Sequence, residues 1–116
     1  MQLFDNTELG LQRAIEGAGL RQQVLAQNIA NANTPGYQRK DVDFHAALQT
    51  AMGEGASALQ DVGFAVQTDQ SATRADGNGV DIDTESANLA ENGLEYQALV
   101  QVARGRLDIL DSAIGH

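Results

Sequence analysis

The sequence predicts a mainly α-helical fold, in which a long helix near each end of the chain forms a coiled-coil-like pair around a short, poorly ordered middle segment. Two apolar patterns, one in each terminal third, recur at the spacing of helix turns. Between them the periodicity weakens, and glycine, alanine and serine cluster. We expect one domain in three parts: a helix and turn over residues 1–37, a flexible middle over 38–83 and a helix over 84–116.

The first helix is expected from about Leu9 to Asn33. Its apolar positions recur at steps of three and four residues, with Gln22 as the single polar interruption: Leu11, Ile15, Ala18, Leu25, Ile29 and Ala32. Such a narrow stripe is typical of a coiled-coil seam. An ordinary two-helix core and a contact between chains explain it equally well.

The second helix is expected from Thr84 to Ile114. Its stripe has the same spacing and consists of Leu89, Gly93, Tyr96, Val100, Ala103, Leu107, Leu110 and Ile114. The Asn78–Gly79 dipeptide favours a turn before it, and Asp83 or Thr84 can cap its first N–H groups. Glu85 then lies near the positive end of the helix dipole.

Glycines weaken both predicted helices, each by up to about 1 kcal/mol relative to alanine. We therefore expect neither helix to persist alone, and a pair of just these two helices to be thin. Gln22 and Gly93 also interrupt the stripes, which argues against strict dimeric coiled-coil geometry. The sequence indicates that further chains complete the structure.

The middle segment gives weaker signals. A short helix is predicted over Phe44–Met52, and a flexible linker over Gly53–Ala58. Alternation of Val62, Phe64 and Val66 is compatible with one short strand, although a lone strand has no partner.

A stretch rich in asparagine, NIANANTPGY, ends the first helix and holds the only proline of the chain. Thr34 precedes Pro35 and is therefore driven out of the helical conformation, while Asn33 tolerates the left-handed one that ends helices. Thr34 to Tyr37 fits a type II turn, with proline and Gly36 at its two central positions. Pro35 is thus expected to stop the helix and fix the direction of the chain.

Asn28 and Asn31 are not explained by this helix stop. Asparagine is a poor helix former, and both positions lie off the apolar stripe. Their amides are suited to hydrogen bonds with neighbouring backbone or with another subunit. Solvated surface positions near a fraying helix end would account for them equally well.

Composition excludes several classes of function. The 116 residues include no cysteine, so no disulfide or thiolate zinc site is expected, and a net charge of −9 disfavours nucleic acid. The first nine residues lack the apolar run of a cleaved signal, and no stretch is long enough to span a bilayer.

No catalytic chemistry is expected either. The two histidines, His45 and His116, are far apart in sequence, and no triad or carboxylate pair is indicated. Asp76 opens a region rich in oxygen ligands, but Val80 and Asp81 occupy the positions where a calcium-binding loop needs a ligand and a glycine. We therefore expect no enzyme activity, no metal, no cofactor and no small-molecule substrate.

LAQNIANANTPGY, from Leu25 to Tyr37, resembles the signature of the bacterial flagellar axial proteins, the rod and hook family. The DVDF that follows, and DGNGVDID with LAENGLEYQAL near the other end, resemble the proximal rod proteins within that family. The resemblance covers roughly the first 44 and the last 41 residues and assigns these to the family motif: Asn28, Ile29, Ala30, Asn31, Asn33, Thr34, Pro35, Gly36 and Tyr37.

The resemblance implies a structural subunit of the flagellar basal-body rod. Such subunits cross the flagellar type III export apparatus unfolded, and their terminal helices order as a coiled coil when subunits stack into a tube. Copies of the same chain, other rod subunits, the basal adaptor protein, the membrane ring and the export gate are the implied partners, and motif residues are expected to pack on adjacent subunits. The alternatives are a sibling rod protein and a soluble two-helix coiled-coil adaptor.

Overall fold

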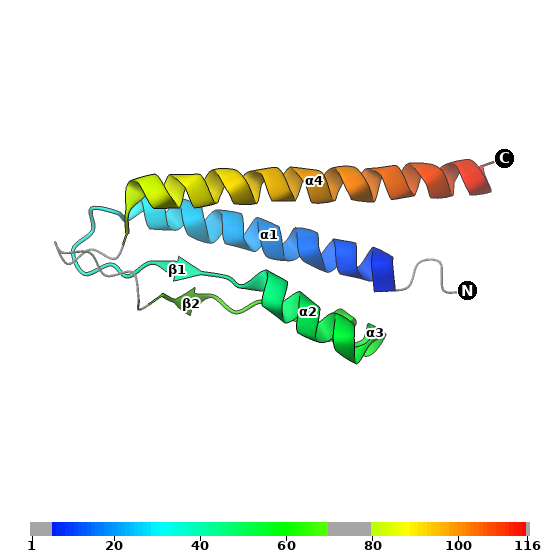
Figure 1. The fold of residues 1–116 in the computed structure, drawn as a ribbon, viewed down its shortest axis with the longest axis horizontal. Helices are drawn as coiled ribbons and strands as arrows, with labels where there is room; N and C mark the ends of the chain where they lie inside the picture. The colour runs from blue at the N-terminus through cyan, green and yellow to red at the C-terminus, as the bar shows by residue number, and fades with distance from the viewer. Residues whose placement is uncertain (1–5, 70–79, 116) are drawn as a thin grey trace.

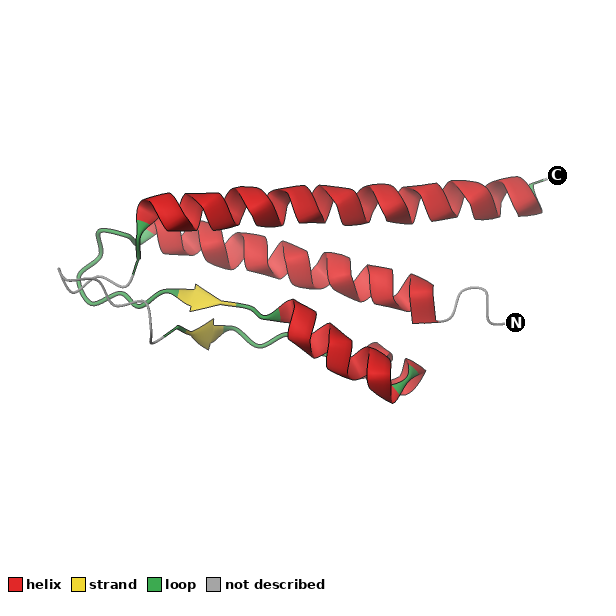
Figure 2. Ribbon diagram, in the orientation of Figure 1, coloured by secondary structure: helices red, strands yellow, loops and turns green. Residues whose placement is uncertain are grey.

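The structure is a computed structural model that describes residues 6–69 and 80–115. Two long antiparallel helices, α1 (Asn6–Ala30) and α4 (Ile82–Ile114), lie side by side (Figure 1). The middle segment returns along α1 as short elements: β1 (Lys40–Asp41), α2 (Phe44–Glu54), α3 (Ala56–Asp61) and β2 (Gln67–Thr68). Helices dominate the described chain, which confirms the mainly α prediction (Figure 2).

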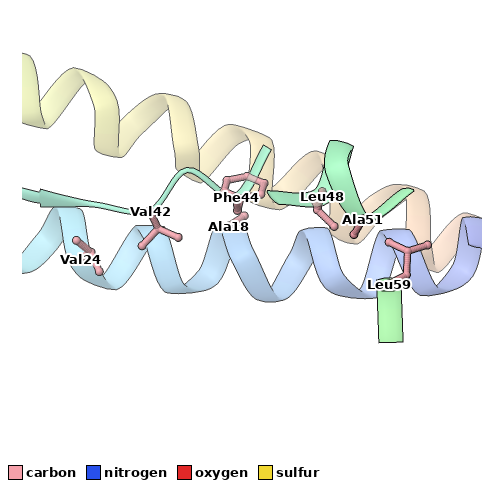
Figure 3. Packing of buried hydrophobic residues seen from close by; sticks show 7 residues of the cluster. All are labelled: Ala18, Val24, Val42, Phe44, Leu48, Ala51 and Leu59. Atoms are coloured by element: carbon pink, nitrogen blue, oxygen red, sulfur yellow. The ribbon is translucent and has the colours of Figure 1, made fainter. Parts of the chain in front are cut away.

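The main apolar core lies between α1 and the α2–α3 segment. Its buried members are Ala18, Val24, Val42, Phe44, Leu48, Ala51 and Leu59 (Figure 3). Phe44 packs directly on Gly17, where a Cβ atom would lie only 2.6 Å from the Cβ atom of Phe44. The glycine therefore permits close approach of α2 to α1.

The contact between α1 and α4 is more polar. Asn92 is fully buried, and its Nδ2 donates to the carbonyl oxygen of Ala18 and to Oε1 of Gln22, each at 2.8 Å. The Gln22 amide also covers Gly93, where a Cβ atom would lie 3.4 Å from Nε2. The two interruptions of the predicted stripes thus meet each other across the helix pair.

The helix ends differ in detail from the sequence predictions. Helix α1 ends at Ala30, and Asn33 does not adopt a positive φ, so neither Asn33 nor Pro35 is its terminator. The chain passes through further turns before the predicted Thr34–Tyr37 turn. In that turn the Tyr37 N–H donates to the Thr34 carbonyl at 3.1 Å, and Gly36 has φ +77°.

Helix α4 begins two residues before the predicted Thr84. Its cap is Asp81, not Asp83 or Thr84, because the Asp81 carboxylate accepts from the N–H groups of both of those residues. The predicted Asn78–Gly79 turn lies outside the described residues.

Within the middle segment, the helix predicted from Phe44 is present and extends to Glu54. The linker predicted over 53–58 is wrong: its first residues complete α2, Gly55 makes a bend with φ +110°, and α3 starts at Ala56. Residues 62–66 are not a strand. The following residues instead form β2, which pairs antiparallel with β1 through Lys40↔Thr68 and Asp41↔Gln67.

Candidate functional site

Asn28, in the last turns of α1, is fully buried and uses all its hydrogen-bonding groups. Its Nδ2 donates to the Lys40 carbonyl at 2.7 Å and to Oε1 of Glu85 at 3.3 Å. Its Oδ1 accepts from the Lys40 N–H and from the Tyr37 hydroxyl, each at 3.0 Å. One amide therefore joins α1, the turn, β1 and the start of α4.

Glu85 and Arg39 form an ion pair beside this amide. The Glu85 side chain is 2% exposed, and the Arg39 guanidinium donates to both of its oxygens, from Nε at 2.8 Å and from Nη2 at 2.9 Å. Arg39 also reaches Asp69 at 2.7 Å and Asp41 at 3.0 Å. Hydrogen bonding to Glu85, above all, raises the Arg39 pKa, so the charge is permanent.

Arg21 extends the cluster back to α1. It grips Asp41 from Nε at 2.7 Å and from Nη2 at 3.2 Å. Burial acts to raise the Asp41 pKa, but the hydrogen bonds from Arg21 and from the Val42 N–H, with the positive charge of Arg21, outweigh it, and the pKa is lowered. We call these residues, with the amide they surround, the Asn28 network: Arg21, Asn28, Tyr37, Arg39, Lys40, Asp41, Asp69 and Glu85.

Tyr37 closes the network over the turn. Its hydroxyl bonds Asn28, its ring lies 5.9 Å from Nζ of Lys40, and burial together with the nearby Glu85 charge raises its pKa. Because burial and a neighbouring anion both disfavour the phenolate, the neutral tyrosine is the form that the fold stabilises.

The other motif residues face outward or make local contacts. Asn31 donates to the Gln27 carbonyl at 2.9 Å and accepts from the Thr34 hydroxyl at 3.2 Å. Ile29 is half-buried. Exposed positions are Ala30, Asn33, Thr34, Pro35 and Gly36. The motif thus has an inner side that holds the chain together and an outer side open to solvent.

The predicted seam residues are unequally placed. Leu25 is fully buried, whereas Leu107 is 59% and Ile114 is 75% exposed. Tyr96 is 37% exposed, and the remaining members are half-buried: Leu11, Ile15, Leu89, Val100 and Leu110. Arg106 of α4 contacts Glu8 in the first turn of α1 at 2.7 Å, so residues 107–114, which we call the α4 overhang, extend past the described start of α1.

A hollow of about 700 Å³ opens beside the network, between β1, β2 and the long helices. Its charged lining includes Arg21, Arg39, Asp41 and Asp69, which already pair with one another. In the described ranges 6–69 and 80–115, no three His, Cys, Asp or Glu side chains converge to hold a metal ion. Nor is any helix in those ranges long and apolar enough to cross a membrane.

Sequence reasoning misses the polar residues that complete the network. It assigns Glu85 only to the helix dipole, yet this is one of the most buried side chains. Arg21, Arg39 and Asp41 give no signal as isolated charges. The available signal is periodicity, because Glu85 precedes Leu89 by one turn and Asn92 follows it by nearly one, so all three share the face toward α1.

Comparison with known proteins shows which family this chain resembles. Residues 12–38, which contain the motif, match the family model described as flagella basal body rod protein. The Proteus mirabilis flagellar basal body rod protein FlgB is 35% identical, over 82% of this chain and 83% of its own length. The FlgB proteins of Escherichia coli K12 and Bacillus subtilis 168 are 35% and 32% identical, over 87% and 98% of this chain and 90% and 97% of their own lengths.

With identity above 30% across nearly its whole length, and with the motif region matched by the family model, this chain belongs to the FlgB family of flagellar basal body rod proteins.

Proposed function

We propose that the chain is a structural subunit of the proximal rod in the flagellar basal body. It is exported by the flagellar type III apparatus and polymerises through its terminal helices into the hollow rod that transmits torque. It carries no chemistry of its own. Family membership supports the rod role and replaces the soluble adaptor alternative.

One structural observation carries the polymerisation part of this proposal: the predicted seam continues past its partner helix. Leu107 and Ile114 lie on the α4 overhang and are largely exposed, whereas Leu89 and Val100, on the same stripe nearer the Asn28 network, are half-buried. Apolar side chains presented in a row gain free energy only when another surface covers them. In a rod, that surface is a neighbouring subunit.

The inner and outer sides of the motif fit the same proposal. Asn28 and Tyr37 fix the turn inside the subunit, which leaves Asn33 and Pro35 exposed at the end of the helix pair. We place this outer side against adjacent subunits, the basal adaptor, the membrane ring or the export gate.

The test is photo-crosslinking in the source bacterium, followed by identification of the captured proteins. A photoreactive residue at exposed Asn33 is expected to capture rod subunits, the adaptor or gate components. The same group at Gln49, exposed on α2, is the control for random capture. Absence of the chain from purified basal bodies, or capture of an unrelated cytoplasmic protein alone, would contradict the proposal.

A further inference from the structure

The contact between α1 and α4 uses only one half of the buried Asn92 amide. Asn92 is fully buried, and its Nδ2 donates to the Ala18 carbonyl and to Oε1 of Gln22. Its Oδ1 is buried as well and has no hydrogen-bond partner among the described residues. The contact therefore depends on the NH2 group, which is the part of the side chain that hydrolysis of an amide removes.

Asn92 is followed directly by Gly93, which makes an Asn–Gly pair within α4. Glycine weakens a helix relative to alanine, and no backbone contact requires it here. A Cβ atom at Gly93 would meet only the amide end of the flexible Gln22 side chain, at 3.4 Å from Nε2. The pair thus joins a buried amide to a neighbour that has no side chain beside its backbone nitrogen.

An asparagine that precedes glycine can lose its side-chain nitrogen without an enzyme. The backbone nitrogen of Gly93 would attack Cγ of Asn92, and the new C–N bond would close a succinimide ring. The Gly93 N–H proton would leave with Nδ2 as ammonia. Water then opens the ring at the side-chain carbonyl to give aspartate, or at the main-chain carbonyl to give isoaspartate. Water is the only co-reactant, and nothing is oxidised or reduced.

The folded subunit blocks this reaction at both reacting groups. Within an α-helix each N–H points along the axis toward the carbonyl four residues earlier, so the Gly93 nitrogen is directed away from Cγ of Asn92. The leaving group, Nδ2, is held by Ala18 and Gln22 in a site without exposed surface. Ring closure therefore requires α4 to lose its helical conformation at Asn92 and to separate from α1.

We propose that Asn92 is a site of spontaneous deamidation that the fold masks, so that its modification records the time a chain has spent unfolded. The product cannot remake the contact. Aspartate at this position has no N–H to donate, and its carboxylate would face the Ala18 carbonyl oxygen in a fully buried site. Isoaspartate adds a methylene group to the backbone within α4 and interrupts the helical hydrogen bonds.

The consequence for the rod is a selection between subunits. A chain that is modified before it folds forms the contact of α1 with α4 less well, and it is expected to enter rods less often. A chain that folds promptly keeps the amide. This consequence rests on the proposed rod function, whereas the masked reaction does not, because the purified chain is sufficient to measure it.

Mass spectrometry of the digested chain, after incubation at neutral pH in buffer or in urea, tests the masking. Conversion of Asn92 in buffer is expected to be at least about tenfold slower than in urea, a factor equivalent to about 1.4 kcal/mol. In urea, Gly93→Ala is expected to slow the reaction, because its methyl group hinders the attacking nitrogen. Asn88, which precedes Leu89, is the internal reference and is expected to react more slowly than Asn92 in urea. Equal conversion of Asn92 in buffer and urea, or of Asn92 and Asn88 in urea, contradicts the inference.

A variant that reproduces the product tests its effect. Asn92→Asp is expected to lower the ratio of folded to unfolded chain at least about tenfold in urea unfolding, because the Ala18 carbonyl loses its donor and a carboxylate is buried. Gln101→Glu makes the same change of amide to carboxylate at an exposed position of α4 and is expected to unfold like the native chain. Equal stability of the two variants contradicts the inference. If the native chain itself is absent from purified basal bodies, the proposed function fails, which distinguishes that failure from failure of the masked site.

Discussion

The two ends of the long helix pair differ in which side chains they bury and which they expose. At the end where α1 finishes and α4 begins, polar groups are buried and paired: Asn28 satisfies all its donors and acceptors, and Glu85 holds Arg39. At the other end, α4 continues past α1 and exposes Leu107, Ile109 and Ile114. A monomer optimised for itself would bury the apolar groups and expose the polar ones.

This contrast separates folding from assembly. The polar end is satisfied within one chain, because Asn28 finds partners there for all its donors and acceptors and both Glu85 oxygens accept from Arg39. At the apolar end, Leu107 and Ile114 stay exposed to solvent among the described residues, and burial of such side chains would be stabilising. Changes at the polar end should therefore affect the stability of the subunit, and changes at the apolar end should affect assembly.

The largest expected effect is at the apolar end. Replacing both Leu107 and Ile114 by Asp is expected to abolish rod assembly, because carboxylates on the seam cannot be buried without partners. Rod content of purified basal bodies is the measurement. Circular dichroism of the purified variant should stay close to that of the native chain, since both side chains are exposed in the subunit. Normal rods from this variant would show that the seam assignment is wrong.

At the polar end, Asn28→Ala is expected to reduce the free energy of unfolding by about 2–4 kcal/mol, because Lys40 and Glu85 lose hydrogen bonds in a buried site. Urea unfolding followed by circular dichroism measures the change. Asn31→Ala in the next turn removes bonds that are exposed to water, so about 1 kcal/mol or less is expected. Similar losses for the two variants would mean that the buried network does not hold the end together.

Between the two ends, a pair of glycine substitutions distinguishes packing from helix propensity. Gly17→Ala places a methyl group against Phe44 and is expected to destabilise the fold by about 1–3 kcal/mol. Gly105→Ala has open space in the subunit and is expected to stabilise α4 by up to about 1 kcal/mol. Thermal unfolding of the two variants should shift in opposite directions. A shift in the same direction would contradict the close contact of α2 with α1.

The smallest expected effect concerns pH at the polar end. Because the Asp41 pKa is lowered in the fold, its stabilising contribution is present above the ordinary aspartate value of about 4 and is lost as the pH falls through the lowered pKa. The stability difference between the native chain and Asp41→Asn should therefore be largest near neutral pH and shrink below about pH 4. Urea midpoints across this range give the result. Asp61→Asn, at an exposed position in α3, is the control, and a difference independent of pH would contradict the role assigned to the Arg21 pair.

Local patterns in the sequence are sufficient for the long helices and the turn. Heptad spacing locates α1 and α4, and the Pro35–Gly36 pair locates a turn with the expected positive φ at Gly36. Helix ends are less well predicted, because several Asp and Thr residues near the start of α4 can cap equally well, and only the fold selects Asp81. The linker prediction over 53–58 fails because a single bend at Gly55 connects α2 directly to α3, and the other residues of this stretch belong to the two helices.

The candidate site is only half predictable. The motif marks Asn28 and Tyr37, which bond each other, but it cannot show that the other partners of Asn28 are Lys40 and Glu85. Those partners are 12 and 57 residues away from Asn28 in the chain. Periodicity reports which side of a helix is apolar, and it says nothing about which distant carboxylate a buried amide meets.

The sequence alone therefore determined the two long helices, the turn at the end of the motif and the excess of acidic charge, because these depend on neighbouring residues or on composition. Tertiary structure decided that the main core lies between α1 and α2, that Gln22 meets Gly93 and Asn92, and that Glu85 becomes buried. It also decided which apolar side chains of α4 remain uncovered. The physical reason is that burial is a property of the docked elements, and docking sets how far one helix extends past another.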